Sequence, residues 1–240
     1  MILRWTLAAA LILAAPAFAA APDKDGYTNI GPTLDGIGKS YMGREIAYVM
    51  GHEAAQWLDR PERNKEEGSE RLVSLLGLKP NDAVADIGAG SGYFSFRLAA
   101  AVPQGYVYAV DIQKEMLDMI KERQARTAQG KAEGANIVTV LGGVADPRLK
   151  PNTIDLILLV DAYHEFSYPR EMGLAMARAL KPGGRIALVE YRGEDPKVPI
   201  RDTHRMTQAQ AKKEMAAVGL TWLRTDDSLP WQHLMFFTKP

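Results

Sequence analysis

An acidic residue and three glycines follow one another at regular intervals near the middle of the chain. Asp86 is followed at every second position by Gly88, Gly90 and Gly92. Glycine permits the positive φ angles of a tight turn, and its lack of a side chain lets a ligand approach backbone N–H groups. An apolar run precedes the motif and an amphipathic pattern follows it. The stretch therefore predicts a strand, a turn and a helix that together bind a nucleotide-like ligand.

Further acidic and imidazole side chains stand after apolar runs typical of strands. Asp111 ends the second such run, where a carboxylate can accept hydrogen bonds from both hydroxyls of a ribose. The fully apolar run 154–160 suits a central parallel strand covered on both faces, and it leads to Asp161, His164 and Glu165. Open α/β sheets bind ligands at the carboxyl ends of their strands, so we expect these residues beside the glycine turn.

The spacing of the acid and the glycines resembles the first motif, D-x-G-x-G-x-G, of the class I S-adenosylmethionine-dependent methyltransferases. Asp111 matches the acid that ends the family's second strand, and residues 180–185 look like its turn into the fifth strand, 186–190. The dinucleotide fingerprint requires a third small residue where this chain has Tyr93, so the spacing disfavours a nicotinamide cofactor.

The resemblance implies a Rossmann-like α/β fold. This is a seven-stranded, mostly parallel sheet with its last strand antiparallel and helices on both faces. Beside the strand that enters the glycine turn, strands are expected at 107–111, 136–141, 154–160, 186–190, 220–224 and 233–239. Helices are expected at 113–128, 168–180 and 207–218. The methyltransferase-like domain would span residues 66–240.

The cofactor implied by the resemblance is S-adenosyl-L-methionine. The residues assigned to it are Asp86, Gly88, Gly90, Gly92, Asp111, Asp146 and Asp161. In the resembled family, the loop that contains Asp146 lies against the adenine ring and commonly supplies an acid to the ring's amine. The alternative is that Asp146 only forms a turn before Pro147.

The acceptor is expected between the loop after the fourth strand and the start of the last strand. The catalytic candidates there are His164, Glu165 and His233. Histidine, with an unperturbed pKa near ~6.5, can accept a proton at neutral pH, and Glu165 or another acid could orient His164. Alternatively, His164 only bonds to backbone, since many methyltransferases rely on positioning alone.

The implied reaction is an in-line displacement in which a nucleophile attacks the methyl carbon and the sulfonium leaves as a neutral thioether. It requires no metal. His164, Glu165, His204 and His233 could in principle bind one, but their spacings fit no standard metal site, so none is predicted.

The first residues have the order of a signal peptide. Arg4 is followed by the apolar run 7–15 and by an A-x-A cleavage site at 17–19, so residues 1–21 predict an exported, periplasmic protein. S-adenosylmethionine is made in the cytoplasm. A non-catalytic exported protein that binds a nucleoside-like ligand is therefore the main alternative function, and a nicotinamide oxidoreductase is a weaker one.

Residues 22–65 are expected to form an N-terminal extension. Residues 22–40 suggest an irregular arm, and apolar residues at helical spacing predict a helix over 44–58 that either covers the cofactor as a lid or simply packs. The mixed charges of 59–70 favour a solvated linker and helix start.

Composition limits the possible partners. The 240 residues contain 29 basic and 29 acidic side chains and no cysteine. The balance gives no reason to expect nucleic acid or a membrane surface as a stable partner after signal cleavage, which leaves a small molecule as the expected substrate. Thiolate catalysis, disulfides and cysteine metal sites are excluded.

Overall fold

The computed structural model describes residues 21–127 and 133–240. The predicted signal peptide lies outside these residues apart from Ala21, as does the end of the predicted helix 113–128. No helix in the described part of the chain is long and apolar enough to span a membrane.

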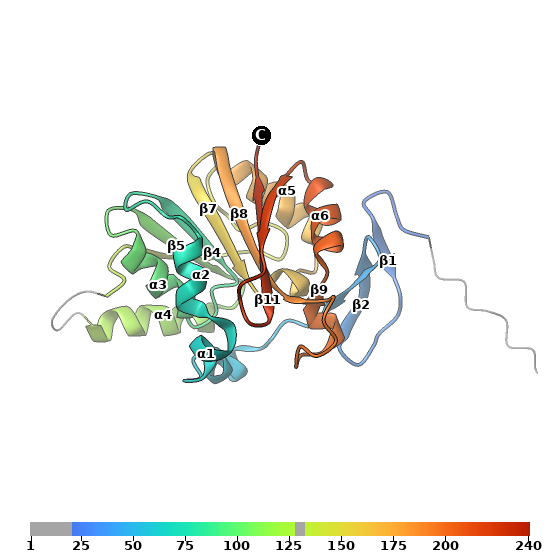
Figure 1. The fold of residues 1–240 in the computed structure, drawn as a ribbon, viewed down its shortest axis with the longest axis horizontal. Coiled ribbons are helices and arrows are strands. Elements are labelled where there is room, and N and C mark those ends of the chain that lie inside the picture. The colour runs from blue at the N-terminus through green and yellow to red at the C-terminus, as the bar shows by residue number, and fades with distance from the viewer. Residues whose placement is uncertain (1–20, 128–132) are drawn as a thin grey trace, which may run out of the picture.

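An eight-stranded sheet, made of seven main strands and one of only two residues, forms the centre of the molecule (Figure 1). Its main strands are β4 (Ala83–Ile87), β5 (Tyr106–Asp111), β6 (Ile137–Leu141), β7 (Ile154–Val160), β8 (Leu180–Arg192), β10 (Thr221–Asp226) and β11 (Gln232–Thr238). They lie in the order β10-β11-β8-β7-β4-β5-β6, and the two-residue β9 (Arg205–Met206) adds to β8. Pairing from β8 to β6 is parallel, whereas β11 runs antiparallel to both neighbours. The predicted fold and its antiparallel last strand are confirmed.

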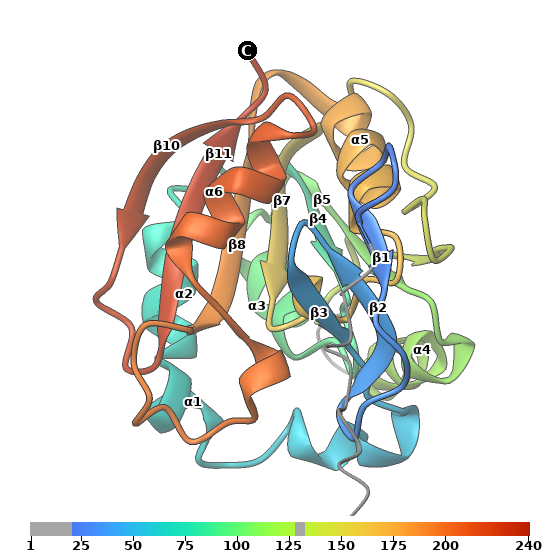
Figure 2. The ribbon, with the colours of Figure 1, turned by 90° about the vertical axis from the view of Figure 1, so that its right-hand side faces the viewer.

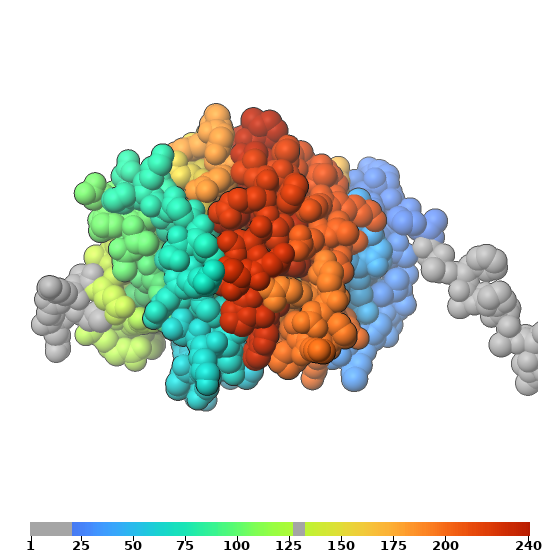
Figure 3. Space-filling model, viewed as in Figure 1, coloured from blue at the N-terminus to red at the C-terminus, as the bar shows by residue number. Residues whose placement is uncertain are grey.

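Helices cover both faces of this sheet, so the molecule has two apolar cores. One core lies under α2 (Ser69–Leu75), α3 (Tyr93–Ala101) and α4 (Lys114–Thr127). The other lies under α5 (Pro169–Ala179) and α6 (Gln208–Ala216). Figure 2 shows α5 and α6 in front of the sheet, with α2 and α3 behind it. On the face shown in Figure 3, α2 packs beside the last hairpin, where Arg71 Nε donates to Ser228 Oγ at 2.9 Å.

The N-terminal extension differs from its prediction. Residues expected to form an irregular arm build a three-stranded antiparallel sheet of β1 (Tyr27–Asn29), β2 (Gly36–Tyr41) and β3 (Arg44–Ala47). The predicted helix over 44–58 is wrong, because Met42 and Gly43 adopt positive φ angles of 50° and 94° and turn β3 back onto β2. The short 3₁₀ helix η1 (His52–Trp57) and α1 (Arg63–Glu67) lead from this sheet into the main domain.

A buried ion pair fixes the small sheet to the main domain. Arg44 Nε and Nη2 donate to Glu214 Oε1 and Oε2 of α6 at 2.7 and 2.9 Å. Arg44 Nη1 also donates to the backbone oxygen of His164 at 3.1 Å. The two side chains are only 8% and 0% exposed, so neither charge has water as an alternative partner.

Arg44→Met should lower the free energy of unfolding by about 3–5 kcal/mol, because it leaves Glu214 buried without its cation. The double variant Arg44→Met/Glu214→Leu should regain at least half of that loss. Arg170→Met, which removes a more exposed pair with Asp25, is the matched control and should cost less than about 1 kcal/mol. Urea denaturation of the four proteins measures these effects. Equal losses for Arg44 and Arg170 would contradict the anchoring role.

Candidate active site

A cavity of about 240 Å³ lies at the carboxyl ends of the central strands. The glycine turn forms one wall, and the segments that follow β5, β6 and β7 form others. The N-terminal extension contributes a cover through Val49, Met50, Trp57 and Leu58, which we call the covering segment (residues 49–58). The cavity is thus closed by two parts of the chain that are far apart in sequence.

The glycine turn is held against the end of β5. Gly88, Gly90 and Gly92 all have positive φ angles, of 79°, 53° and 86°. The Gly90 N–H donates to Asp111 Oδ2 at 2.9 Å, and the Gln113 N–H donates to Oδ1 at 2.9 Å. Burial raises the pKa of Asp111, although these backbone donors oppose the shift. Asp111 therefore stands in a fixed orientation on the cavity wall, together with Gly88 and Gly90.

Asp86 and Gly92 shape the turn from beneath and do not line the cavity. Asp86 is buried, and its Oδ2 accepts the Ser95 hydroxyl of α3 at 2.6 Å. Burial raises the pKa of Asp86 to about 6 despite this hydrogen bond. A Cβ on Gly92 would approach Ile120 to 2.8 Å, so this glycine allows α3 and α4 to pack closely. The positions of Asp86 and Gly92 therefore do not support direct contact with the cofactor.

Asp161 follows β7 in a left-handed conformation, with φ of 49°, which is uncommon for a residue other than glycine. Its Oδ2 accepts the Gln232 amide at 3.1 Å, whereas the buried Oδ1 has no hydrogen-bond partner among the described residues. Burial, reinforced by Glu67 and Glu190, raises the pKa of Asp161 well above its usual range. The cavity therefore contains an acceptor that a cationic donor would satisfy.

A chain of three side chains reaches the acceptor end of the cavity. His164 Nδ1 lies 2.6 Å from Glu190 Oε2, and His164 Nε2 lies 2.9 Å from His204 Nδ1. Burial lowers the pKa of His164, but the charge and hydrogen bond of Glu190 outweigh it and raise the pKa above its usual value. The acid that orients His164 is thus Glu190, and not Glu165, which the sequence analysis named first. The sequence signal for it was a carboxylate at the end of an otherwise apolar strand.

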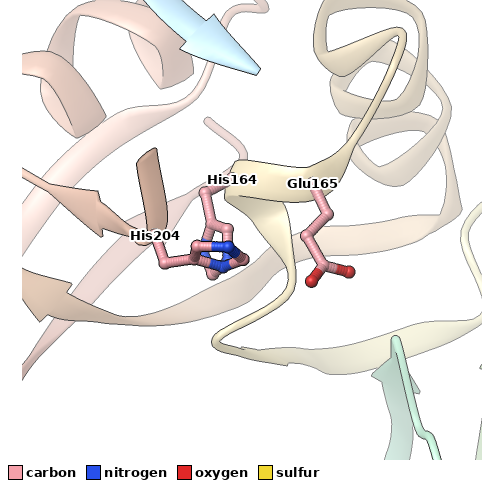
Figure 4. Close-up of side chains that lie close together, drawn as sticks. All are labelled: His164, Glu165 and His204. Carbon is pink, nitrogen blue, oxygen red and sulfur yellow. The ribbon is translucent and has the colours of Figure 1, made fainter. Parts of the chain in front are cut away.

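His204 ends the short helix η3 (Asp202–His204) in the long loop after β8 and is half-buried on the cavity wall. Burial, together with the neighbouring His164, lowers its pKa to about 4. Glu165, from η2 (Tyr163–Glu165), also lines the cavity, and burial raises its pKa to about 7. Its Oε1 accepts the Met50 N–H of the covering segment at 3.2 Å. Figure 4 shows the two imidazole rings close together and the Glu165 carboxylate beside them.

The charged run 59–70 is not the solvated linker that its composition favours. Arg63 and Glu67 are only 5% and 3% exposed, and Arg63 Nε donates to Glu67 Oε2 at 2.8 Å. Glu67 Oε1 also accepts Arg60 Nη2 at 2.6 Å and the Tyr191 hydroxyl at 3.2 Å. These pairings satisfy the charges, so Arg63 and Glu67 can form part of the cavity wall.

Two predicted site residues lie away from the cavity lining. Asp146 is exposed, and its Oδ1 accepts the Arg148 N–H at 2.7 Å in a turn around Pro147. His233 is fully buried on β11, where burial lowers its pKa and neither ring nitrogen has a hydrogen-bond partner among the described residues. The structure brings neither residue to the ligand, because Asp146 turns toward solvent and His233 is enclosed within the fold.

Comparison with known proteins agrees with this geometry. The profile of a methyltransferase domain matches residues 84–184. A malonyl-acyl-carrier protein O-methyltransferase from Methylococcus capsulatus is 28% identical over 82% of this chain and 72% of its own length. The ubiquinone/menaquinone biosynthesis C-methyltransferase UbiE of Ectopseudomonas mendocina is 25% identical over 71% of this chain and 66% of its own length. Residues 84–184 therefore form a methyltransferase domain, and the chain as a whole is similar to class I S-adenosylmethionine-dependent methyltransferases.

A solved relative confirms the fold of this methyltransferase. The crystal structure of a SAM-dependent methyltransferase from Aquifex aeolicus superimposes with a TM-score of 0.73 at 21% identity, over 80% of this chain and all of that chain. At that identity the likeness concerns the fold alone. The family gives S-adenosylmethionine as the cofactor.

The residues of the cavity fit this cofactor. S-adenosylmethionine is a cation at its sulfur and carries an ammonium group, and the unpartnered Oδ1 of Asp161 can accept a hydrogen bond from such a group. A Cβ on Gly88 would lie 2.6 Å from the Cβ of Ala162, so no larger residue fits between the turn and the segment after β7. The methyltransferase thus keeps bare backbone and a buried acceptor where the cofactor binds.

Asp111→Ala should weaken binding of S-adenosylhomocysteine by about 2 kcal/mol, because it removes the acceptor assigned to the ribose hydroxyls. Asp146→Ala is the matched control, and we expect its affinity to stay within about twofold of wild type, since Asp146 does not line the cavity. Isothermal titration calorimetry measures both. Unchanged binding by Asp111→Ala would refute the ribose assignment, and a large loss in Asp146→Ala would restore the adenine assignment.

Proposed function

We propose that this methyltransferase transfers the methyl group of S-adenosylmethionine to a small, largely apolar acceptor by in-line displacement. The observation that carries the proposal is that one cavity joins the glycine turn to the cluster of His164, Glu165 and His204. Alignment of two bound reactants is the main requirement of such a reaction. A single cavity with a cofactor end and a polar acceptor end supplies it.

At the cofactor end, each polar group has a suitable partner on the cofactor. Asp111 would accept hydrogen bonds from the ribose, and Asp161 would accept one from the ammonium group. Arg63, which lines the cavity close to Glu67, offers a cation for the carboxylate of the methionine part. Gly88 and Gly90 would let the cofactor approach the backbone.

The covering segment lies directly over the glycine turn. A Cβ on Gly90 would lie 2.5 Å from Leu58 Cδ1, so Leu58 rests on this glycine. The cavity of about 240 Å³ is also smaller than the roughly 300–1,000 Å³ usual for ligand sites. Both observations support a covering segment that shifts to admit the cofactor, which is the lid role of the two that the sequence analysis left open.

The acceptor end combines apolar walls with a few polar groups. Its apolar side chains include Val49, Phe166, Met172 and Ile200. Such a lining favours an apolar acceptor whose nucleophilic atom points toward the cluster of His164, Glu165 and His204. One relative carries the name of a ubiquinone and menaquinone methyltransferase, which supports this class of acceptor. The nucleophile attacks the methyl carbon, the carbon–sulfur bond breaks, and a neutral thioether leaves.

Calorimetric titration of the purified protein should show binding of S-adenosylhomocysteine and none of NAD. A panel of phenols, quinols, thiols and amines with tritium-labelled S-adenosylmethionine then identifies the acceptor. Phe166→Ala should lower kcat/KM for that acceptor at least tenfold without changing the affinity for S-adenosylhomocysteine. Tyr168→Ala, an exposed aromatic outside the cavity lining, is the control and should retain full activity. Equal activity of the two variants would refute the acceptor end.

We also propose that the protein is exported, on the basis of Arg4, the apolar run 7–15 and the A-x-A site. The mature chain should begin at or within two residues of Ala20. Intact mass spectrometry of the protein isolated from its native cells checks this. A chain that retains Met1 and stays in the cytosol would contradict it.

A further inference from the structure

Three potential metal ligands meet at the acceptor end of the cavity. One ligand atom from each of His164, Glu165 and His204 lies within 4.8 Å of the other two. They come from η2 and η3, which are separated in sequence by β8 and most of the long loop that follows it. Figure 4 shows the two imidazole rings close together, with the Glu165 carboxylate beside them. We propose that they bind one divalent transition-metal ion.

The two imidazoles already have the separation that a shared ion requires. His164 Nε2 and His204 Nδ1 are 2.9 Å apart. Two nitrogen ligands about 2.1 Å from one ion and at right angles to each other are about 3.0 Å apart. A hydrogen bond between the rings would give the same distance. The separation therefore permits an ion, and the evidence that favours one is the group bonded to the other ring nitrogen of His164.

Glu190 is the group that holds the other ring nitrogen of His164. Its Oε2 lies 2.6 Å from His164 Nδ1, and its Oε1 accepts the backbone N–H of His164 at 3.2 Å. Histidines that bind metals almost always donate their other ring N–H to a carboxylate or carbonyl, which fixes the tautomer and orients the ring. With Nδ1–H donated to the fully buried Glu190, the lone pair of Nε2 faces His204 and the cavity.

Glu165 completes the set after a small movement. The largest separation of two ligands around one ion is about 4.2 Å, somewhat less than the 4.8 Å span of the cluster. A side-chain rotation that moves the carboxylate oxygen of half-buried Glu165 by roughly half an ångström is sufficient. The 3.2 Å hydrogen bond that this carboxylate accepts from the Met50 N–H restrains it only weakly. Two imidazoles and one carboxylate suit Zn²⁺, Mn²⁺, Fe²⁺ or Co²⁺, whereas Mg²⁺ and Ca²⁺ prefer oxygen ligands.

The ion would have open positions facing the cavity, since all three ligands line it. This inference rests on the proposed function for its role. A hydroxyl of the acceptor bound at an open position would lose its proton to water more easily. The resulting oxyanion attacks the methyl carbon, the carbon–sulfur bond breaks, and the neutral thioether leaves. The ion keeps its charge and oxidation state throughout.

The test uses Co²⁺, whose visible absorption reports nitrogen ligands. The protein is purified without a polyhistidine tag, freed of metals with a chelator and titrated with Co²⁺. Wild type should bind one ion per chain, and a tenfold excess of Mg²⁺ should not displace it. His204→Ala and Glu165→Gln should each weaken Co²⁺ binding at least tenfold. His52→Ala is the matched control, because the chain has four histidines and His52 lies outside the cluster.

The outcomes are separable from those of the proposed function. Circular dichroism shows whether each variant is folded, and its affinity for S-adenosylhomocysteine shows whether the cofactor site is intact. Because His204 is only half-buried, its replacement disturbs the core least. Absence of a Co²⁺ spectrum in wild type, or equal binding by folded His204→Ala, overturns the metal site. Failure to bind S-adenosylhomocysteine would instead refute the proposed function and leave the Co²⁺ titration valid.

Discussion

Buried negative charge at the carboxyl edge of the sheet is the constraint around which this structure is arranged. Burial raises the pKa of Asp86, Asp111 and Asp161. For Asp86 the folded pKa of about 6 exceeds the ordinary 3.8, so the folded chain binds more protons between these values and becomes less stable as the pH rises through them. Donors from Ser95 and Gly90 offset part of this cost, and a cationic cofactor offsets more.

The N-terminal extension supplies two buried cations near this edge of the sheet. Arg44 pairs with Glu214 and also donates to the backbone of His164, so the small sheet positions the acceptor end directly. Arg63 pairs with Glu67 on the cavity wall. The extension that covers the cavity thus also neutralises two buried acids, Glu214 of α6 and Glu67 of the cavity wall.

Local patterns in the sequence were sufficient to predict the sheet, because strand and helix periodicities and the glycine turn depend on neighbouring residues. The remaining features depend on contacts between distant segments. Arg44 looks like part of a helix until Glu214, from the far end of the chain, is placed beside it. Arg63 looks solvated until the Tyr93 ring and the Glu67 carboxylate are placed beside it. His204 stands in a long loop whose only helix is the three-residue η3.

In the proposed function, the same buried acids bear on the release of the spent cofactor. Before transfer the cofactor would bring a sulfonium charge into a cavity lined by the buried carboxyl groups of Asp111 and Asp161, and after transfer its sulfur would be neutral. In a cavity with largely apolar walls, the attraction between a carboxylate and a cation is stronger than in water. Loss of the sulfonium charge therefore removes a favourable interaction from the product state. If the covering segment shifts to release the spent cofactor, as proposed, this weaker binding would assist the step that the closed geometry would otherwise slow.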